Sequence, residues 1–209
     1  ALEGKKELPL MLVENQQYIH YSKGSVVMYA LKDYIGEDSL NAALRKYIKK
    51  VAYQEAPYTN SIEFIGFLKE ACPDSLKYVI KDMFEDITVY ENYIQDLSYE
   101  PTKDGKYKVK LTLGSVKFKA DSLGKQKKVA VADYIDVGIF SEKDVNGKKE
   151  EKELIFKKIK MDKDLKTFEF IVDEKPIKAG IDPYCKLVDR KPENNTWKFG
   201  RKPPKVSTA

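Results

Sequence analysis

The spacing of apolar residues changes near residue 87, and this change constrains the fold more than any other feature of the chain. Before it, apolar residues recur every three or four positions, as on one face of a helix. After it, apolar and polar residues alternate in short segments separated by turns, which is typical of a β-sandwich. The sequence therefore predicts an α+β fold, with an N-terminal helical subdomain followed by an antiparallel β-sandwich.

Four helices are expected between residue 23 and about residue 86. The first carries Val26, Ala30 and Leu31 and ends at Gly36, a residue type that adopts the left-handed conformation at helix ends. Side-chain oxygens that accept first-turn N–H groups mark the later helix starts. The candidate caps are Asp38 or Ser39 for the second helix, residues 59–61 for the third and Asp74 for the fourth.

The strand region shows clear alternation and one strong turn. Val109, Leu111 and Leu113 share a face, and Val116 and Phe118 are expected to continue the apolar pattern. Asn146-Gly147 predicts a β-hairpin because both residues tolerate positive φ. The predicted organisation is a helical domain at residues 1–95, a sandwich at 96–200 and a flexible tail at 201–209.

Composition excludes several classes of protein. No apolar run approaches the roughly 20 residues of a membrane helix, so no membrane-inserted segment is expected. Cys72 and Cys185 are far apart and are expected to be buried free thiols. One histidine, His20, and two scattered cysteines do not provide a self-contained zinc site.

The charge is unevenly distributed. Residues 1–100 hold 11 Lys and Arg against 16 Asp and Glu, whereas residues 101–209 hold 27 against 17. The balance of −5 against +10 indicates two modules. In the basic half, lysines alternate with apolar residues, which is the pattern of the solvent face of a sheet. No nucleic-acid partner is therefore expected, although a surface that binds anionic polymers is an alternative.

A short motif precedes the first helix. Tyr21-Ser22-Lys23-Gly24 leads directly into an apolar helix, and the later Gly36-Glu37-Asp38 and Leu44-Arg45-Lys46-Tyr47 follow in a matching order. This segment resembles the tyrosine motif of M1-family zinc aminopeptidases, and the resemblance extends from residue 9 to about residue 95. Residues 179–190 are similar to the tail of a bacterial M1 branch fused to ABC-type permease segments.

The resemblance implies a function. In M1 enzymes a tyrosine, here Tyr21, donates a hydrogen bond to the oxyanion that forms when water attacks the scissile carbonyl. Gly24 would let the chain turn tightly into the helix. The His-Glu-x-x-His zinc motif, the glutamate ligand and the Gly-x-Met-Glu-Asn motif of the family are missing from this sequence.

The expected function follows from the resemblance at Tyr21 and from the missing zinc motif. The chain should be a C-terminal fragment that contributes Tyr21 and a supporting sandwich and is inactive by itself. It should hold no cofactor, whereas the parent would hold zinc and cleave peptides. Its partner would be the N-terminal zinc-bearing part of the same polypeptide, in a membrane-anchored bacterial parent.

Each chemical assignment has a structural alternative. Tyr21 could be a buried tyrosine that anchors the first helix, and Tyr18 is expected to pack in the core. Lys23 is expected to pack or to pair with a carboxylate at the helix start. The chain as a whole could instead be a non-catalytic interaction module, with a helical adaptor and an immunoglobulin-like sandwich. That alternative predicts a buried Tyr21 and an exposed apolar patch on the sandwich.

Overall fold

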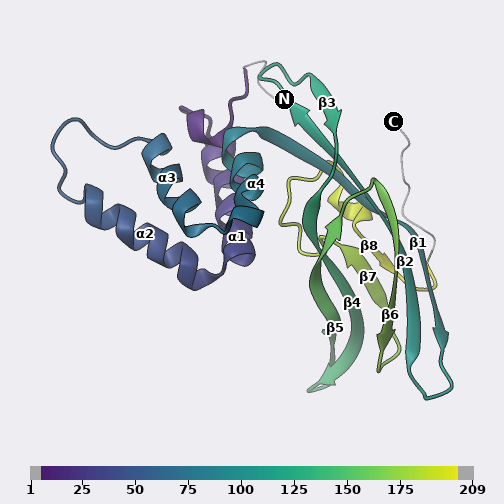
Figure 1. The fold of residues 1–209 in the computed structure, drawn as a ribbon. Coiled ribbons are helices and arrows are strands. Elements are labelled where there is room, and N and C mark those ends of the chain that lie inside the picture. Colours follow the sequence, from purple (N-terminus) through teal and green to yellow (C-terminus); the bar gives the residue numbers. More distant parts are fainter. Residues whose placement is uncertain (1–5, 202–209) are drawn as a thin grey trace. The chain divides into compact units, whose positions relative to one another are not determined.

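The computed structural model describes residues 6–201 and confirms the α+β fold, with helices in the N-terminal part followed by two antiparallel sheets in a sandwich-like arrangement (Figure 1). The chain divides into two compact units. The helical unit comprises the described residues up to Val89, Phe118–Lys127 and Lys186–Val188. The sandwich unit comprises Tyr90–Lys117, Lys128–Cys185 and the described residues from Asp189 onward. Residues 202–209 of the predicted tail lie outside the described residues.

The helical unit contains α-helices joined to short 3₁₀ and π turns. Its core is formed by apolar side chains that are at most 3% exposed, among them Ala30, Leu31, Leu68 and Ile80. The elements are η1 (Leu10–Leu12), η2 (Tyr18–Lys23), α1 (Gly24–Ile35), α2 (Glu37–Val51), α3 (Ser61–Ala71), η3 (Asp74–Leu76), α4 (Lys77–Ile80) and η4 (Lys81–Glu85).

One of the three predicted helix caps is confirmed and two are wrong. Asn60 caps α3, because its side chain accepts a hydrogen bond of 3.0 Å from the N–H of Glu63. The cap predicted at Asp74 is wrong, since Asp74 begins the 3₁₀ turn η3 and its carboxylate instead pairs with Lys77. The cap predicted at Asp38 or Ser39 is also wrong, because α2 already begins at Glu37.

Gly36 alone connects α1 to α2. It has φ 88° and ψ 147°, a backbone conformation that is essentially restricted to glycine. Its N–H donates to the carbonyl of Lys32 over 2.9 Å, and its carbonyl accepts from the N–H of Leu40 over 3.1 Å. One residue therefore ends the first helix and begins the second.

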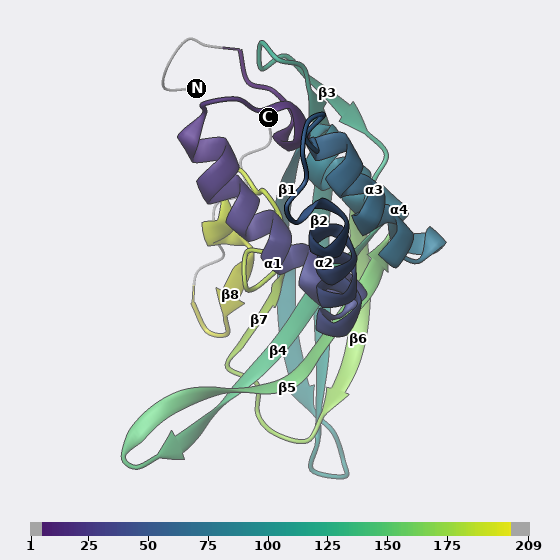
Figure 2. The same ribbon diagram turned by 90° about the vertical axis from the view of Figure 1, so that its left-hand side faces the viewer.

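The strands form two four-stranded sheets. In one sheet β2 pairs with β1, β3 and β6, and in the other the order is β5-β4-β7-β8. The β4–β5 hairpin turns at Asn146 and Gly147, both with positive φ as predicted, and extends past β7 and β8 (Figure 2). The strands are β1 (Ile87–Pro101), β2 (Tyr107–Ala120), β3 (Gln126–Val129), β4 (Asp133–Val145), β5 (Lys148–Met161), β6 (Leu165–Val172), β7 (Lys178–Ile181) and β8 (Thr196–Lys198).

The buried face of β2 departs from the prediction at its second half. Val109, Leu111 and Leu113 are fully buried, as expected from the alternation. The expectation that Val116 and Phe118 continue the pattern is wrong. The strict period of two instead places Ser115 and Lys117 on the buried side.

Glycines allow close approaches in the sandwich unit. A Cβ atom at Gly180 in β7 would lie 2.6 Å from the carbonyl oxygen of Asn195 and 2.8 Å from a methyl carbon of Thr196. A Cβ atom at Gly114 would lie within 2.5 Å of three ring atoms of Tyr93. These contacts indicate that the strands pack without spare volume at both positions.

Candidate functional site

Tyr21 lies in η2, a π-helical turn that runs without a break into α1. The N–H of Gly24 donates to the carbonyl of Ile19, five residues earlier, and closes the wide turn. Ile19 is 1% exposed and anchors the turn in the core. Because each residue advances by roughly 80–100° around such a helix, Tyr21 points to the opposite side. π-helical turns are rare and frequently occur at functional sites.

The Tyr21 side chain is 68% exposed. Its ring lies 4.9 Å from the His20 imidazole, measured between centroids, at an interplanar angle of 48°. None of residues 6–201 forms a hydrogen bond with the Tyr21 hydroxyl. The alternative of a buried anchor is wrong for Tyr21, because Ile19 has that position.

Tyr21 belongs to a row of exposed apolar side chains, called here the aromatic stripe. Tyr18 is 47% exposed, Val26 37% and Tyr29 54%. Their spacing places all four on one side of the continuous helix formed by η2 and α1. The prediction that Tyr18 packs in the core is therefore wrong. A contiguous exposed apolar surface of this kind marks a site of interaction.

Lys23 and Gly24 complete the motif. Burial lowers the pKa of the Lys23 ammonium, and the nearby carboxylate of Glu7 opposes this shift. Gly24 has φ −60° and ψ −42°, which are ordinary helical values. A Cβ atom there would lie 3.8 Å from a Leu10 methyl carbon, an ordinary contact. The expected tight turn at Gly24 is therefore wrong.

The residues described, 6–201, include no group of three or more His, Cys, Asp and Glu that could hold a metal ion. Cys72 is a buried free thiol, as predicted, and burial raises its pKa. Cys185 is exposed, contrary to the prediction. Its N–H donates to the carbonyl of Asp182 in a tight turn, and this turn places the residue at the surface.

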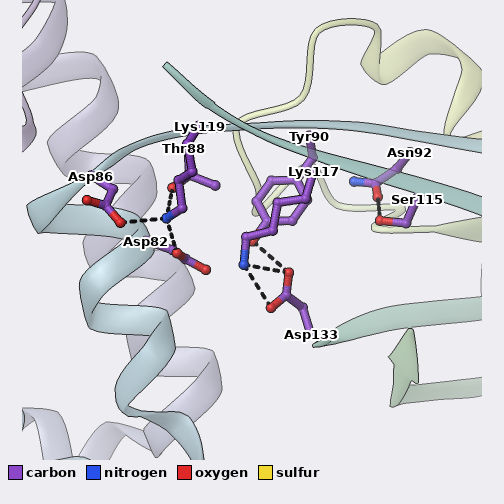
Figure 3. A network of polar contacts seen from close by, with 9 residues as sticks. All are labelled: Asp82, Asp86, Thr88, Tyr90, Asn92, Ser115, Lys117, Lys119 and Asp133. Carbon is purple, nitrogen blue, oxygen red and sulfur yellow. Dashed lines mark hydrogen bonds and ion pairs between the residues drawn. The ribbon is translucent and has the colours of Figure 1, made fainter. Parts of the chain in front are cut away.

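Two lysines lie two residues apart on one face of β2, Lys117 buried and Lys119 half-buried, each with its own carboxylate partners (Figure 3). In the helical unit, Lys119 donates to Asp82, to Asp86 over 2.7 Å and to the Thr88 hydroxyl over 2.8 Å. An ammonium has three N–H donors, so these three acceptors saturate it. The cluster therefore holds the start of β1 and the end of β2 to η4, and Lys119 has no donor left for a ligand.

In the sandwich unit, Lys117 lies 2.9 Å from both carboxylate oxygens of Asp133. The Tyr90 hydroxyl donates to the same carboxylate over 3.2 Å, and the ammonium lies 5.7 Å from the Tyr90 ring centroid. The lysine and aspartate side chains are 7% and 4% exposed. Beside this cluster, the Ser115 hydroxyl donates to the Asn92 carbonyl oxygen over 2.7 Å (Figure 3). Sequence reasoning missed these contacts, and the strict alternation that places Lys117 beside the core was the available signal.

None of the described helices combines the length and the apolar composition that a membrane span requires. Comparison with known proteins gives no family assignment. No family model matches the chain, and no curated protein is significantly similar to it. The exposed Tyr21 on its π-helical turn is therefore the described side chain best placed to contact a substrate.

Proposed function

We propose that this chain is the C-terminal part of an M1-type zinc aminopeptidase and that it supplies the tyrosine which stabilises the oxyanion. In this proposal Tyr21 is the catalytic residue, the helical unit completes the wall of the substrate cleft, and the sandwich unit supports it. The substrate is a peptide that is cleaved at its N-terminal end.

One observation carries the proposal: Tyr21 is exposed within the aromatic stripe and is not buried in the helical core. A tyrosine that only stabilised the helix would bury its ring, just as the neighbouring Ile19 buries its side chain. The exposed neighbours Tyr18, Val26 and Tyr29 form a surface that another part of the polypeptide can cover. Covering this stripe would exclude water around the hydroxyl and strengthen any hydrogen bond that it donates.

The chemistry of a phenol suits this role. During attack on a peptide carbonyl, negative charge develops on the carbonyl oxygen, and a fixed O–H donor stabilises it more than it stabilises the substrate. Phenols keep their proton at neutral pH and can donate it in a hydrogen bond without being charged. The anchor at Ile19 fixes the turn that carries Tyr21, which limits the reorganisation needed in the transition state.

The described residues do not fit a zinc ion, because they contain no suitable group of ligands. The proposal therefore assigns the metal and the general base to the N-terminal zinc-bearing part of the same polypeptide. It follows that the 209-residue chain alone should not hydrolyse peptides. Zinc-stimulated turnover of an aminoacyl anilide by the purified chain would contradict this division.

The decisive experiment uses the full-length polypeptide. Tyr21→Phe removes the donor and keeps the ring, so kcat should fall by about 10²–10³-fold while KM changes little. Tyr29→Phe makes the same chemical change on the same stripe and should leave kcat unaltered. If the Tyr21→Phe enzyme keeps its kcat, Tyr21 has no part in the reaction.

The rival functions have weaker support. The interaction-module alternative expects a buried Tyr21, whereas the side chain is 68% exposed. The polyanion alternative needs lysines that are free to bind, but several sandwich lysines pair with carboxylates. Examples are Lys149 with Glu142 at 2.8 Å and Lys108 with Glu169 at 3.0 Å.

A further inference from the structure

A second exposed apolar cluster lies at the end of the α2–α3 hairpin and is called here the hairpin tip. It comprises the last turns of α2, the loop at residues 52–60 and the first turn of α3. In Figure 1 this loop lies at the far end of the hairpin from α1. Its large apolar side chains are all more than half exposed: Ile48 59%, Tyr53 103%, Tyr58 75% and Ile62 64%.

The hairpin tip is held together without these four side chains. The Tyr47 hydroxyl donates to the Thr59 hydroxyl over 3.2 Å, and Lys50 pairs with Glu63 at 2.6 Å. The Tyr47 ring also packs edge-on against Phe64, 5.1 Å between centroids. These contacts join the two helices, so Ile48, Tyr53, Tyr58 and Ile62 are not needed to close the hairpin.

The hairpin tip is also basic within an acidic part of the chain. Residues 1–100 carry a net charge of −5, yet α2 between residues 39 and 51 contains four cations and no acid. Lys50 pairs with Glu63, whereas Arg45, Lys46 and Lys49 are exposed. The loop adds one acid, Glu55. Exposed cations therefore adjoin exposed tyrosines and isoleucines.

We propose that the hairpin tip binds the surface of an anionic lipid bilayer. Tyrosine side chains favour the bilayer interface, where the ring contacts acyl chains and the hydroxyl reaches water and headgroups. Lysine and arginine extend their charged ends to anionic headgroups. A protein partner fits less well, because lysine is depleted in the cores of protein interfaces. The tip lies on the membrane and does not cross it.

This inference is independent of the proposed peptidase function, because it concerns the opposite end of α2 from Gly36 and needs neither Tyr21 nor a metal. The 209-residue chain can therefore be tested directly for binding. The probe is a vesicle of phosphatidylcholine with about one third phosphatidylserine, and the reference is phosphatidylcholine alone. Co-sedimentation should show binding to the anionic vesicles, with weaker binding at high salt.

Two variants separate the contributions of charge and apolar contact. Lys46→Gln/Lys49→Gln should weaken binding about 25-fold, since each cation near an anionic surface contributes about fivefold. Tyr53→Ser/Tyr58→Ser keeps the charge and should weaken binding about tenfold or more. All four side chains are exposed, so the fold should be retained.

A matched control distinguishes a local site from net charge. Lys103→Gln/Lys127→Gln removes the same charge from exposed positions elsewhere and should change binding by much less than the tip variant. The proposal is overturned if the unaltered chain does not bind anionic vesicles, or if the control weakens binding as much as Lys46→Gln/Lys49→Gln. It is also overturned if Tyr53→Ser/Tyr58→Ser binds normally. A change in oligomeric state without vesicle binding would assign the tip to a contact between copies instead.

Discussion

The helical unit exposes more of its large apolar side chains than the sandwich unit does. The helical unit leaves tyrosines and isoleucines exposed in the aromatic stripe and at the hairpin tip. The sandwich unit buries a charged pair, Lys117 and Asp133. The exposed residues do not reflect a poorly formed helical core, because Ala30, Leu31 and Leu68 are fully buried. The comparison indicates that most of the exposed apolar surface available for contacts lies on the helical unit.

The largest effect on stability is expected at the buried charged pair. Lys117→Met leaves the Asp133 carboxylate buried without its cation and should destabilise the sandwich unit by about 3–5 kcal/mol. The single tryptophan, Trp197 in β8, reports unfolding of this unit by fluorescence. Lys117→Met/Asp133→Asn should recover part of the loss, because it removes the buried negative charge and keeps an acceptor for Tyr90. A loss below about 1 kcal/mol in the single variant would show that the pair does not hold the core.

The next largest effect is expected where strands pack most closely. Gly180→Ala places a methyl group against the Asn195 carbonyl and Thr196, and should cost about 1–3 kcal/mol by forcing β7 and β8 apart. Denaturant unfolding followed by Trp197 fluorescence measures the change. An unaltered midpoint would mean that this part of the sandwich has more spare volume than the contacts indicate.

The matching substitution in the helical unit should have the opposite sign. Gly66 lies inside α3, and a Cβ atom there would have no neighbour within 4 Å. Gly66→Ala should therefore stabilise the helical unit by about 0.5–1 kcal/mol through helix propensity alone. The helical circular dichroism signal during denaturation is the measurement. If Gly66→Ala instead destabilised the helical unit, another group would have to pack against position 66, and the two glycine substitutions would no longer differ in sign.

The smallest effects concern pH, and the two units should respond in opposite directions. Burial raises the pKa of the Asp189 carboxyl in the sandwich unit, against hydrogen bonds from the N–H groups of Lys191 and Asn92. The folded state therefore holds this proton more tightly, and stability falls as pH rises from about 4 through the folded pKa. For Lys23 burial lowers the pKa, so stability of the helical unit rises as the pH rises through the folded pKa.

Substitutions isolate each titration. Asp189→Asn should reduce the decline in sandwich stability as the pH rises above about 4, followed by Trp197 fluorescence. Lys23→Met should remove the increase in stability of the helical unit at alkaline pH, and circular dichroism measures this stability. Unchanged pH profiles in both variants would show that burial of these groups has no linkage to folding.

Local patterns predicted the features that depend on neighbouring residues. The change of period near residue 87, the cap at Asn60 and the turn at Asn146–Gly147 all follow from residue types within a few positions. The location of Tyr21 before an apolar helix could also be read from the sequence. Its π-helical geometry could not, because a shift from four-residue to five-residue hydrogen bonding leaves little trace in apolar spacing.

Features that depend on distant residues were missed. The alternation along β2 places Lys117 on the buried side, but the sequence does not indicate its partner Asp133, sixteen positions later. Asp74 has the residue type of a cap, but its neighbours form a 3₁₀ turn and its carboxylate pairs with Lys77. Tyr18 is exposed because its neighbour Ile19 takes the buried position. Both residues are apolar, so the apolar pattern alone does not tell which of the two is buried.

Because Gly36 alone connects α1 to α2, its backbone angles set the direction of the whole of α2. The helix has 15 residues and therefore extends about 22 Å from that pivot. A rotation of about 10° at Gly36 would move the far end of the helix by about 4 Å, roughly the width of one side-chain contact. The position of the loop at residues 52–60 therefore depends on the backbone angles of one residue. A residue with a side chain at position 36 would change the direction of α2 and move this loop.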